Sequence, residues 1–158
     1  MKRFLVALIT LVFISTNLYS AGIIKKYDSF KKITTYQSEA FDIEDGSYYL
    51  IAATGLNIDN AVYSLSVITV YYADSWRFYN SAYDSKGNKL KLIETGRDVD
   101  CSLNGCQYSE VLCFIFTKRE FKAMKNGVTI KIYGRAGNNI IINIPGNDVK
   151  ELIAAVNK

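Results

Sequence analysis

The stretch YSLSVITVYYA, residues 63–73, decides the fold class. Within it the large residues Leu65, Val67 and Tyr71 alternate with smaller or polar neighbours such as Ser64 and Ser66. Alternation with a period of two is typical of a β-strand with one buried face, and β-branched and aromatic residues favour strands. The pattern therefore predicts a strand over residues 63–73, the longest β-like run in the chain.

Further β-like runs lie on both sides of this strand, joined by short turn signals such as Asp45-Gly46. Short loops between neighbouring strands indicate antiparallel pairing, because parallel strands need long crossovers. Residues 23–32, with four lysines, fit either a short helix or an extended lead-in. We predict the other strands at residues 33–41, 47–54, 76–83, 89–94, 107–116, 128–133 and 140–144, with one more beginning at Val99.

Two helices are predicted near the C-terminus. Thr117 and Glu120 have the spacing of a capping box, with Phe116 and Phe121 placed as a hydrophobic staple. The second helix follows Pro145-Gly146 with Asn147 or Asp148 as its cap, and its apolar residues recur at helical spacing: Val149, Leu152, Ile153 and Val156. The chain is thus predicted to be α+β, a single domain over residues 21–158 with a curved antiparallel β-sheet and two C-terminal helices packed on one face.

Residues 1–20 have the layout of a secretory signal peptide. Lys2 and Arg3 precede an apolar run over residues 4–14, and small residues near 20–22 offer a cleavage site. A retained membrane anchor is the alternative, but that run is about half of the roughly 20 apolar residues a bilayer span needs. We therefore expect an exported protein, periplasmic or secreted, with no stable membrane span after cleavage.

The composition excludes several classes of function. The 158 residues include no histidine, which rules out a Ser-His-Asp triad, a Cys-His pair and an imidazole metal ligand. Cleavage removes two basic residues and no acid, which lowers the net charge from +4 to +2 and gives little reason to expect a nucleic-acid partner. The sequence contains no recognisable catalytic, metal or cofactor motif, so a non-enzymatic role is favoured.

The three cysteines suit an oxidising compartment. Cys101 and Cys106 enclose a loop with the turn dipeptide Asn104-Gly105, so in an exported protein we expect a disulfide between two neighbouring strands. Cys113 lies among core-forming residues and is expected to be a buried small hydrophobe, with pairing to another chain or reshuffling as alternatives.

Glu110 is the most unusual carboxylate, because alternation places it on the same face as Tyr108 and Leu112. An unpaired buried charge is costly, so a buried ion pair is expected, with Arg77, Arg97 and Arg135 as candidate partners. Exposure at a strand end and a role as a functional acid are the alternatives.

Candidate binding residues fall in two places. Trp76, Arg77 and Tyr79 belong to an aromatic cluster of residue types that carry binding energy at interfaces, although packing within the sheet explains aromatic residues equally well. The loop between the cysteines supplies the other set: Ser102, Leu103 and Asn104.

The order of several elements resembles small exported bacterial proteins of uncharacterised function. These elements are the segment 76–79, the triplet Tyr108-Ser109-Glu110, a helix bearing Phe121, the triplet Ile132-Tyr133-Gly134 and a last amphipathic helix. The six-residue Cys-to-Cys loop also resembles one in a periplasmic lysozyme inhibitor family, in which the loop needs a histidine that this chain lacks. The first resemblance implies export and lends no catalytic residue.

Three functional hypotheses follow. The first is a non-enzymatic binding protein of the cell envelope, contacting an unknown protein or small ligand through the cysteine loop and the aromatic cluster. The second is an envelope hydrolase with Glu110 as acid and Asp98 or Asp100 as base, as in enzymes that use paired carboxylates. The third is a small-molecule carrier, which needs an apolar cavity lined by the sheet.

Overall fold

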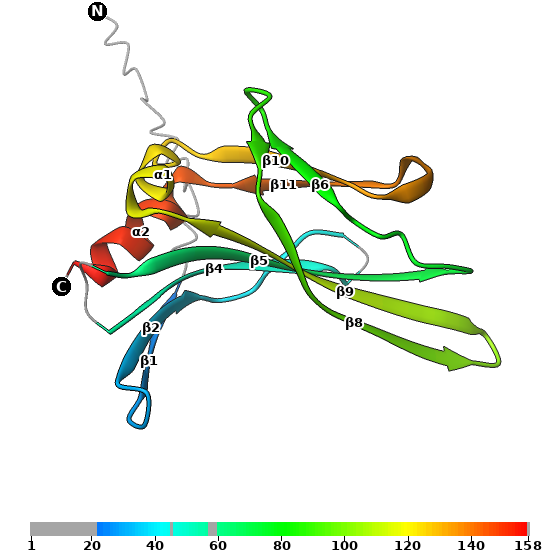
Figure 1. Ribbon diagram of the computed structural model, residues 1–158, viewed down its shortest axis with the longest axis horizontal. Helices are drawn as coiled ribbons and strands as arrows, with labels where there is room; N and C mark the ends of the chain where they lie inside the picture. Colours follow the sequence, from blue (N-terminus) through cyan, green and yellow to red (C-terminus); the bar gives the residue numbers. More distant parts are fainter. Residues whose placement is uncertain (1–21, 45, 57–59, 158) are drawn as a thin grey trace, which may run out of the picture.

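The computed structural model describes residues 22–44, 46–56 and 60–157 (Figure 1). The expected signal peptide, residues 1–20, lies outside the described residues. Over the described part the chain is one small domain, mostly antiparallel β-sheet with two C-terminal α-helices.

The strands divide between two sheets, where the sequence suggested one. The larger sheet, sheet A, has the order β1-β2-β4-β5-β9-β8, with β3 also paired to β4. All of its pairs are antiparallel. Its strands are β1 (Ile23–Asp28), β2 (Ile33–Ser38), β3 (Phe41–Asp42), β4 (Tyr48–Gly55), β5 (Val62–Ala73), β8 (Leu92–Ser102) and β9 (Gly105–Phe116).

The smaller sheet, sheet B, has the order β11-β10-β6-β7 and is also antiparallel. Its strands are β6 (Ser81–Asp84), β7 (Lys89–Leu90), β10 (Val128–Tyr133) and β11 (Asn139–Ile144). The two sheets are separate because β5 is paired on both sides, with β4 and β9, whereas β6, the next strand along the chain, pairs with β10 and β7.

One expected strand is much shorter than the sequence suggested. Of residues 76–83, only Ser81 onward joins a sheet, while Trp76–Asn80 form no strand. Residues 23–28, for which helix and extended chain were both open, form β1. Cys113 is half-buried and not buried as expected, because alternation along β9 turns it away from the face of Leu112 and Phe114.

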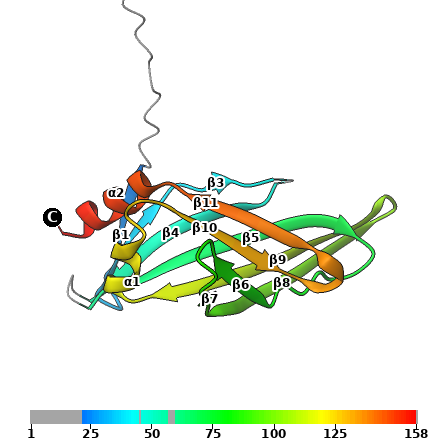
Figure 2. The same ribbon diagram turned by 90° about the horizontal axis from the view of Figure 1, so that it is seen from above.

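The helices α1 (Lys118–Ala123) and α2 (Gly146–Val156) contact each other and lie together at one end of the molecule (Figures 1 and 2). The capping box of α1 is formed as predicted: Thr117 Oγ1 accepts from Glu120 N, and Glu120 Oε2 accepts from Thr117 N. The predicted cap of α2 is wrong, because Pro145 occupies the cap position.

A close backbone approach explains why the first residue of α2 is glycine. A Cβ at Gly146 would lie 2.5 Å from the Lys125 carbonyl oxygen, so only glycine fits where the chain crosses the end of α1. The helix begins at Gly146, and Asp148 is buried within its first turn.

The hydrophobic core is formed by both sheets together with α2. Sheet A contributes Ile51, Leu65 and Leu112, and sheet B contributes Ile130 and Ile142, all at most 1% exposed. Val149, Leu152 and Val156 add the apolar stripe of α2.

Candidate functional site

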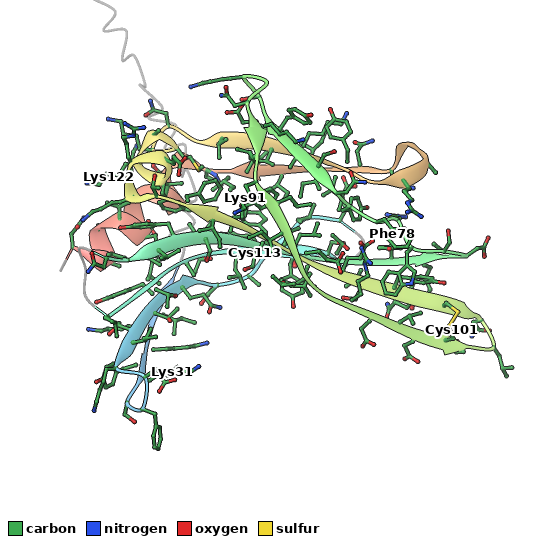
Figure 3. The ribbon with its side chains drawn as sticks, in the orientation of Figure 1. Lys31, Phe78, Lys91, Cys101, Cys113 and Lys122 are labelled. Atoms are coloured by element: carbon green, nitrogen blue, oxygen red, sulfur yellow. A yellow bond between two sulfur atoms is a disulfide. The ribbon has the colours of Figure 1, made fainter. Side chains whose placement is uncertain are left out.

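The hairpin of β8 and β9 extends to the end of the molecule opposite the helices (Figure 1). Its final pairs are Cys101 with Cys106 and Ser102 with Gly105. The two cysteines form the predicted disulfide, with an S–S length of 2.08 Å (Figure 3). The covalent bond therefore joins neighbouring strands directly behind the turn.

The turn itself exposes an apolar side chain. Leu103 is 106% exposed relative to its reference, and Asn104 N donates to Ser102 Oγ at 3.2 Å. Within this turn only Gly105 takes a positive φ, +119°. Gly105 accommodates this conformation because it has no Cβ.

Glu110 lies near the base of this hairpin and has no exposed surface. Its Oε1 accepts from Tyr71 Oη at 2.6 Å and from Phe78 N at 3.1 Å, and its Oε2 accepts from Tyr79 N at 3.3 Å. A carboxylate with several donors is stabilised in a buried position, since each bond offsets part of the lost hydration.

These hydrogen bonds hold the segment 76–79, which is part of the connection between β5 of sheet A and β6 of sheet B. Phe78 has a φ of +48°, a conformation that is uncommon for a bulky residue. The amides of Phe78 and Tyr79 bond to Glu110 and not to a neighbouring strand, while Arg77 N donates to Tyr71 Oη at 2.9 Å. Glu110 and Tyr71 together therefore anchor the segment.

Of the three candidate arginines, Arg97 is the one whose guanidinium lies beside Glu110. Arg97 Nε is 3.5 Å from Glu110 Oε2, and the same side chain also pairs with Glu94. Arg97 and Glu110 are direct cross-strand partners. The guanidinium of Arg135 instead stacks on the ring of Phe78 at 4.0 Å, and that of Arg77 lies over the ring of Tyr71 at 4.2 Å.

Two tyrosines in this cluster are held in the protonated form. Burial raises the pKa of Tyr71 above its ordinary value, and Glu110 adds to that shift. Burial likewise raises the pKa of Tyr79, against an opposing effect of Arg77. A protonated Tyr71 is the state that can donate to Glu110.

The aromatic cluster is only partly available to a partner. Trp76 is half-buried and its ring packs edge-on against that of Tyr108 at 4.8 Å. Phe78 lies between the guanidiniums of Arg97 and Arg135, at 4.6 Å and 4.0 Å from its ring. Tyr79 is 2% exposed, so it belongs to the core and not to the contact surface expected from the sequence.

The carboxylates proposed as a catalytic pair lie on opposite faces of sheet A. Glu110 pairs with Arg97 across the ladder, whereas Asp98 and Asp100 pair with Ser109 and Gln107. Because side chains alternate along a strand, Asp98 and Asp100 point away from the face of Glu110. This arrangement does not bring an acid and a base to one substrate.

Sequence reasoning missed Tyr71 and Phe78 as parts of the Glu110 cluster. Tyr71 pairs with Tyr108 across the ladder, one diagonal step from Glu110. That position follows only from the register of β5 and β9, which the alternation within each strand does not fix. The positive φ of Phe78 has no signal in the sequence.

Comparison with protein-family models, with curated proteins and with solved structures found no match to this chain. Neither α-helix in the described part of the chain has the length and apolar character that crossing a membrane requires.

Proposed function

We propose that this chain is an exported, non-enzymatic protein that binds a partner of the cell envelope through the tip of the β8–β9 hairpin. The observation that carries the proposal is the tip itself, where Leu103 is fully exposed directly beyond the Cys101–Cys106 disulfide. An apolar side chain on a covalently closed turn loses little conformational freedom on binding, so more of its burial contributes to affinity.

Ser102, Leu103 and Asn104 form the primary contact in this proposal. Trp76 and Arg77 lie toward the same end of the molecule and form a secondary contact beside the hairpin; Figure 3 shows the neighbouring Phe78 and Cys101 in that half. Arginine and tryptophan supply planar surfaces that are frequent at interfaces. The Glu110 cluster fixes the backbone from which Trp76 and Arg77 project.

The disulfide is compatible with an oxidising compartment and supports export, together with the signal-peptide layout of residues 1–20. We propose a periplasmic or secreted location, among small exported bacterial proteins like those that the sequence resembles. Contacts of α2 with β2 and β4 support the finer architecture, in which the helices pack on one face of a curved sheet.

The alternative functions have less support. The hydrolase needs Glu110 and Asp98 or Asp100 around one substrate, and strand alternation separates them. The carrier needs an apolar cavity between sheet and helices, where buried side chains such as Ile51, Leu65 and Leu152 pack.

Site-specific photocrosslinking tests the proposal. A benzoylphenylalanine placed at Leu103 in the full chain should give a discrete crosslinked product in the envelope fraction of the source cell. The matched control is the same group at Phe30, which is 97% exposed at the turn of the β1–β2 hairpin. Both positions present an aromatic ketone to solvent on a hairpin turn, so they differ mainly in the surrounding surface.

A product from position 103 that position 30 does not give supports the tip as the contact. Equal products from both positions, or none from position 103, would contradict it. Mass spectrometry of the recovered protein tests export independently, because cleavage near residue 20 and a disulfide each change the mass in a defined way.

A further inference from the structure

Strand β11 is an edge of sheet B, paired with β10 on one side only. Tyr49 Oη donates to the carbonyl of Asn143 at 3.1 Å, so that carbonyl points away from β10. Backbone groups of alternate residues point the same way along an antiparallel strand, which directs the amide and carbonyl of Ile141 outward as well. Among the described residues no strand pairs with this side of β11.

A groove runs along this free side. Its larger part has a volume of about 520 Å³, with residues 141–143 of β11 on one side and residues 39–44, which include β3, on the other. A smaller hollow of about 190 Å³ shares Ile43, Glu44 and Ile141 and continues the groove along β11. Figure 2 shows β3 and β11 next to each other at this side of the molecule.

The larger part of the groove is acidic. Glu39, Asp42 and Glu44 line it, and no lysine or arginine does. The whole chain carries the opposite net charge, +4. Phe41 and the half-exposed Ile141 add apolar surface between the carboxylates. The lining therefore complements a segment that bears both cationic and apolar side chains.

The other long edges carry features that discourage strand addition. Edge strand β8 carries Glu94, Arg97, Asp98 and Asp100 together with a register shift at Glu94–Gly96, and edge strand β1 carries Lys25 and Lys26. Charges and bulges of this kind keep edge strands from pairing with other chains. Strand β11, with the sequence NIIINI, has neither a charge nor a proline.

We propose that this groove binds an extended segment of a partner polypeptide bearing lysine or arginine, which pairs with β11 as an additional strand of sheet B. In this mode main-chain hydrogen bonds to Ile141 supply affinity, and alternate side chains of the segment select the partner. One side of the segment contacts Phe41 and Ile141, while its cations approach Asp42 and Glu44. The groove involves none of the residues of the hairpin tip and shares only Arg77, which lines the smaller hollow, with the secondary contact proposed above. The peptide experiment below and the crosslinking at Leu103 therefore test the two proposals separately.

The test uses a short, end-blocked peptide of alternating lysine and valine, with a matched peptide in which glutamate replaces lysine. We expect the lysine peptide to bind the full chain and to slow hydrogen exchange at the Ile141 amide by about tenfold or more. The glutamate peptide should leave that amide unchanged. Equal binding of the two peptides would overturn the proposal.

Ile141→Pro removes the outward amide and leaves the β10–β11 ladder intact, because that amide is not part of the ladder and proline is tolerated on edge strands. We expect it to weaken binding of the lysine peptide by about tenfold or more, whereas Ile141→Thr, which keeps the amide, binds nearly as the parent does. Equal binding by these two variants would overturn strand addition.

If Ile141→Pro does not fold, Glu44→Lys provides a second test, which measures the contribution of the acidic lining to binding. It should weaken binding of the lysine peptide more than Asp74→Lys, which changes the net charge equally at an exposed position outside the groove lining. Equal effects of the two charge changes would overturn the proposed role of the groove. Self-association of the parent chain that Ile141→Pro abolishes would also overturn it, since the occupant would then be a second copy.

Discussion

Two hairpins of sheet A project in different directions and are closed by different means (Figure 1). The β8–β9 turn is closed by the Cys101–Cys106 disulfide, whereas the β1–β2 turn is closed by Asp28, whose Oδ1 accepts from the amides of Phe30 and Lys31 at 3.0 Å. Each turn exposes one large apolar residue, Leu103 at 106% and Phe30 at 97%.

The hairpins differ more at their bases than at their tips. Strand β9 carries the buried Glu110, which bonds to the chain segment connecting the two sheets, while β1 is exposed along nearly its whole length. The β8–β9 hairpin is thus fixed at both ends, by a covalent bond and by a buried polar cluster. Exposure alone does not distinguish the tips, so rigidity is the property that singles out Leu103.

Removing the Glu110 carboxylate should have the largest effect on stability. Glu110→Ala leaves Tyr71 Oη and two backbone amides without their acceptor, while the Arg97 guanidinium keeps only its pair with Glu94. A buried donor left without an acceptor costs about 1–3 kcal/mol, so three such donors lead us to expect a loss of about 3–5 kcal/mol in the free energy of unfolding measured in urea.

Thr35→Ala is the matched change in the other hairpin, where Thr35 Oγ1 lies 3.2 Å from Thr54 Oγ1. It should cost about 1 kcal/mol or less, because it removes a single partly buried hydrogen bond. A smaller loss for Glu110→Ala than for Thr35→Ala would show that the carboxylate does not anchor the β8–β9 hairpin.

Removing the disulfide should have an intermediate effect. Replacement of Cys101 and Cys106 by serine removes a short covalent loop and so raises the conformational entropy of the unfolded chain. The chain-entropy relation predicts that this costs about 2 kcal/mol of stability. We expect a loss of this order in the free energy of unfolding, together with faster hydrogen exchange at Leu103 and Asn104.

Asp28→Ala is the comparable change in the β1–β2 turn, because it removes the carboxylate that accepts from the amides of Phe30 and Lys31. Its two exposed side-chain hydrogen bonds are accessible to water, so the expected loss is about 1 kcal/mol or less. Equal losses from opening the two turns would remove the distinction between the covalent and the hydrogen-bonded closure.

The sequence predicted most of the elements of the fold and less of their arrangement. Alternation over residues 63–73 identified β5, and the Thr117–Glu120 spacing identified the start of α1, because both signals are local. The division into two sheets depends on which strands pair, and alternation shows only which side chains share a face. Segment 76–80 has β-favouring residues, yet the bonds from its amides to Glu110 override that preference.

The candidate site was likewise predictable only where its signal is local in the sequence. The spacing of Cys101 and Cys106, together with the expectation of export, was enough to predict their disulfide. Glu110 was recognisable as a carboxylate on an apolar face, but the choice among Arg77, Arg97 and Arg135 required the β8–β9 register. The groove beside β11 had no sequence signal, since residues 39–44 and 141–143 meet only through the packing of one sheet on the other.

The smallest effects on stability are expected from substitutions at the two tips. There we expect the two hairpins to differ only in partner binding. Leu103→Asp and Phe30→Asp change fully exposed turn residues, so each should alter the free energy of unfolding by no more than about 0.5 kcal/mol. Only Leu103→Asp should prevent recovery of the crosslinking partner, because a carboxylate at that tip would have to be desolvated in the bound state. The measurement pairs thermal unfolding with capture of that partner from the envelope fraction by the two variants. A clear loss of stability in Leu103→Asp would instead make Leu103 a packing residue, and equal capture by both variants would exclude the tip as the contact.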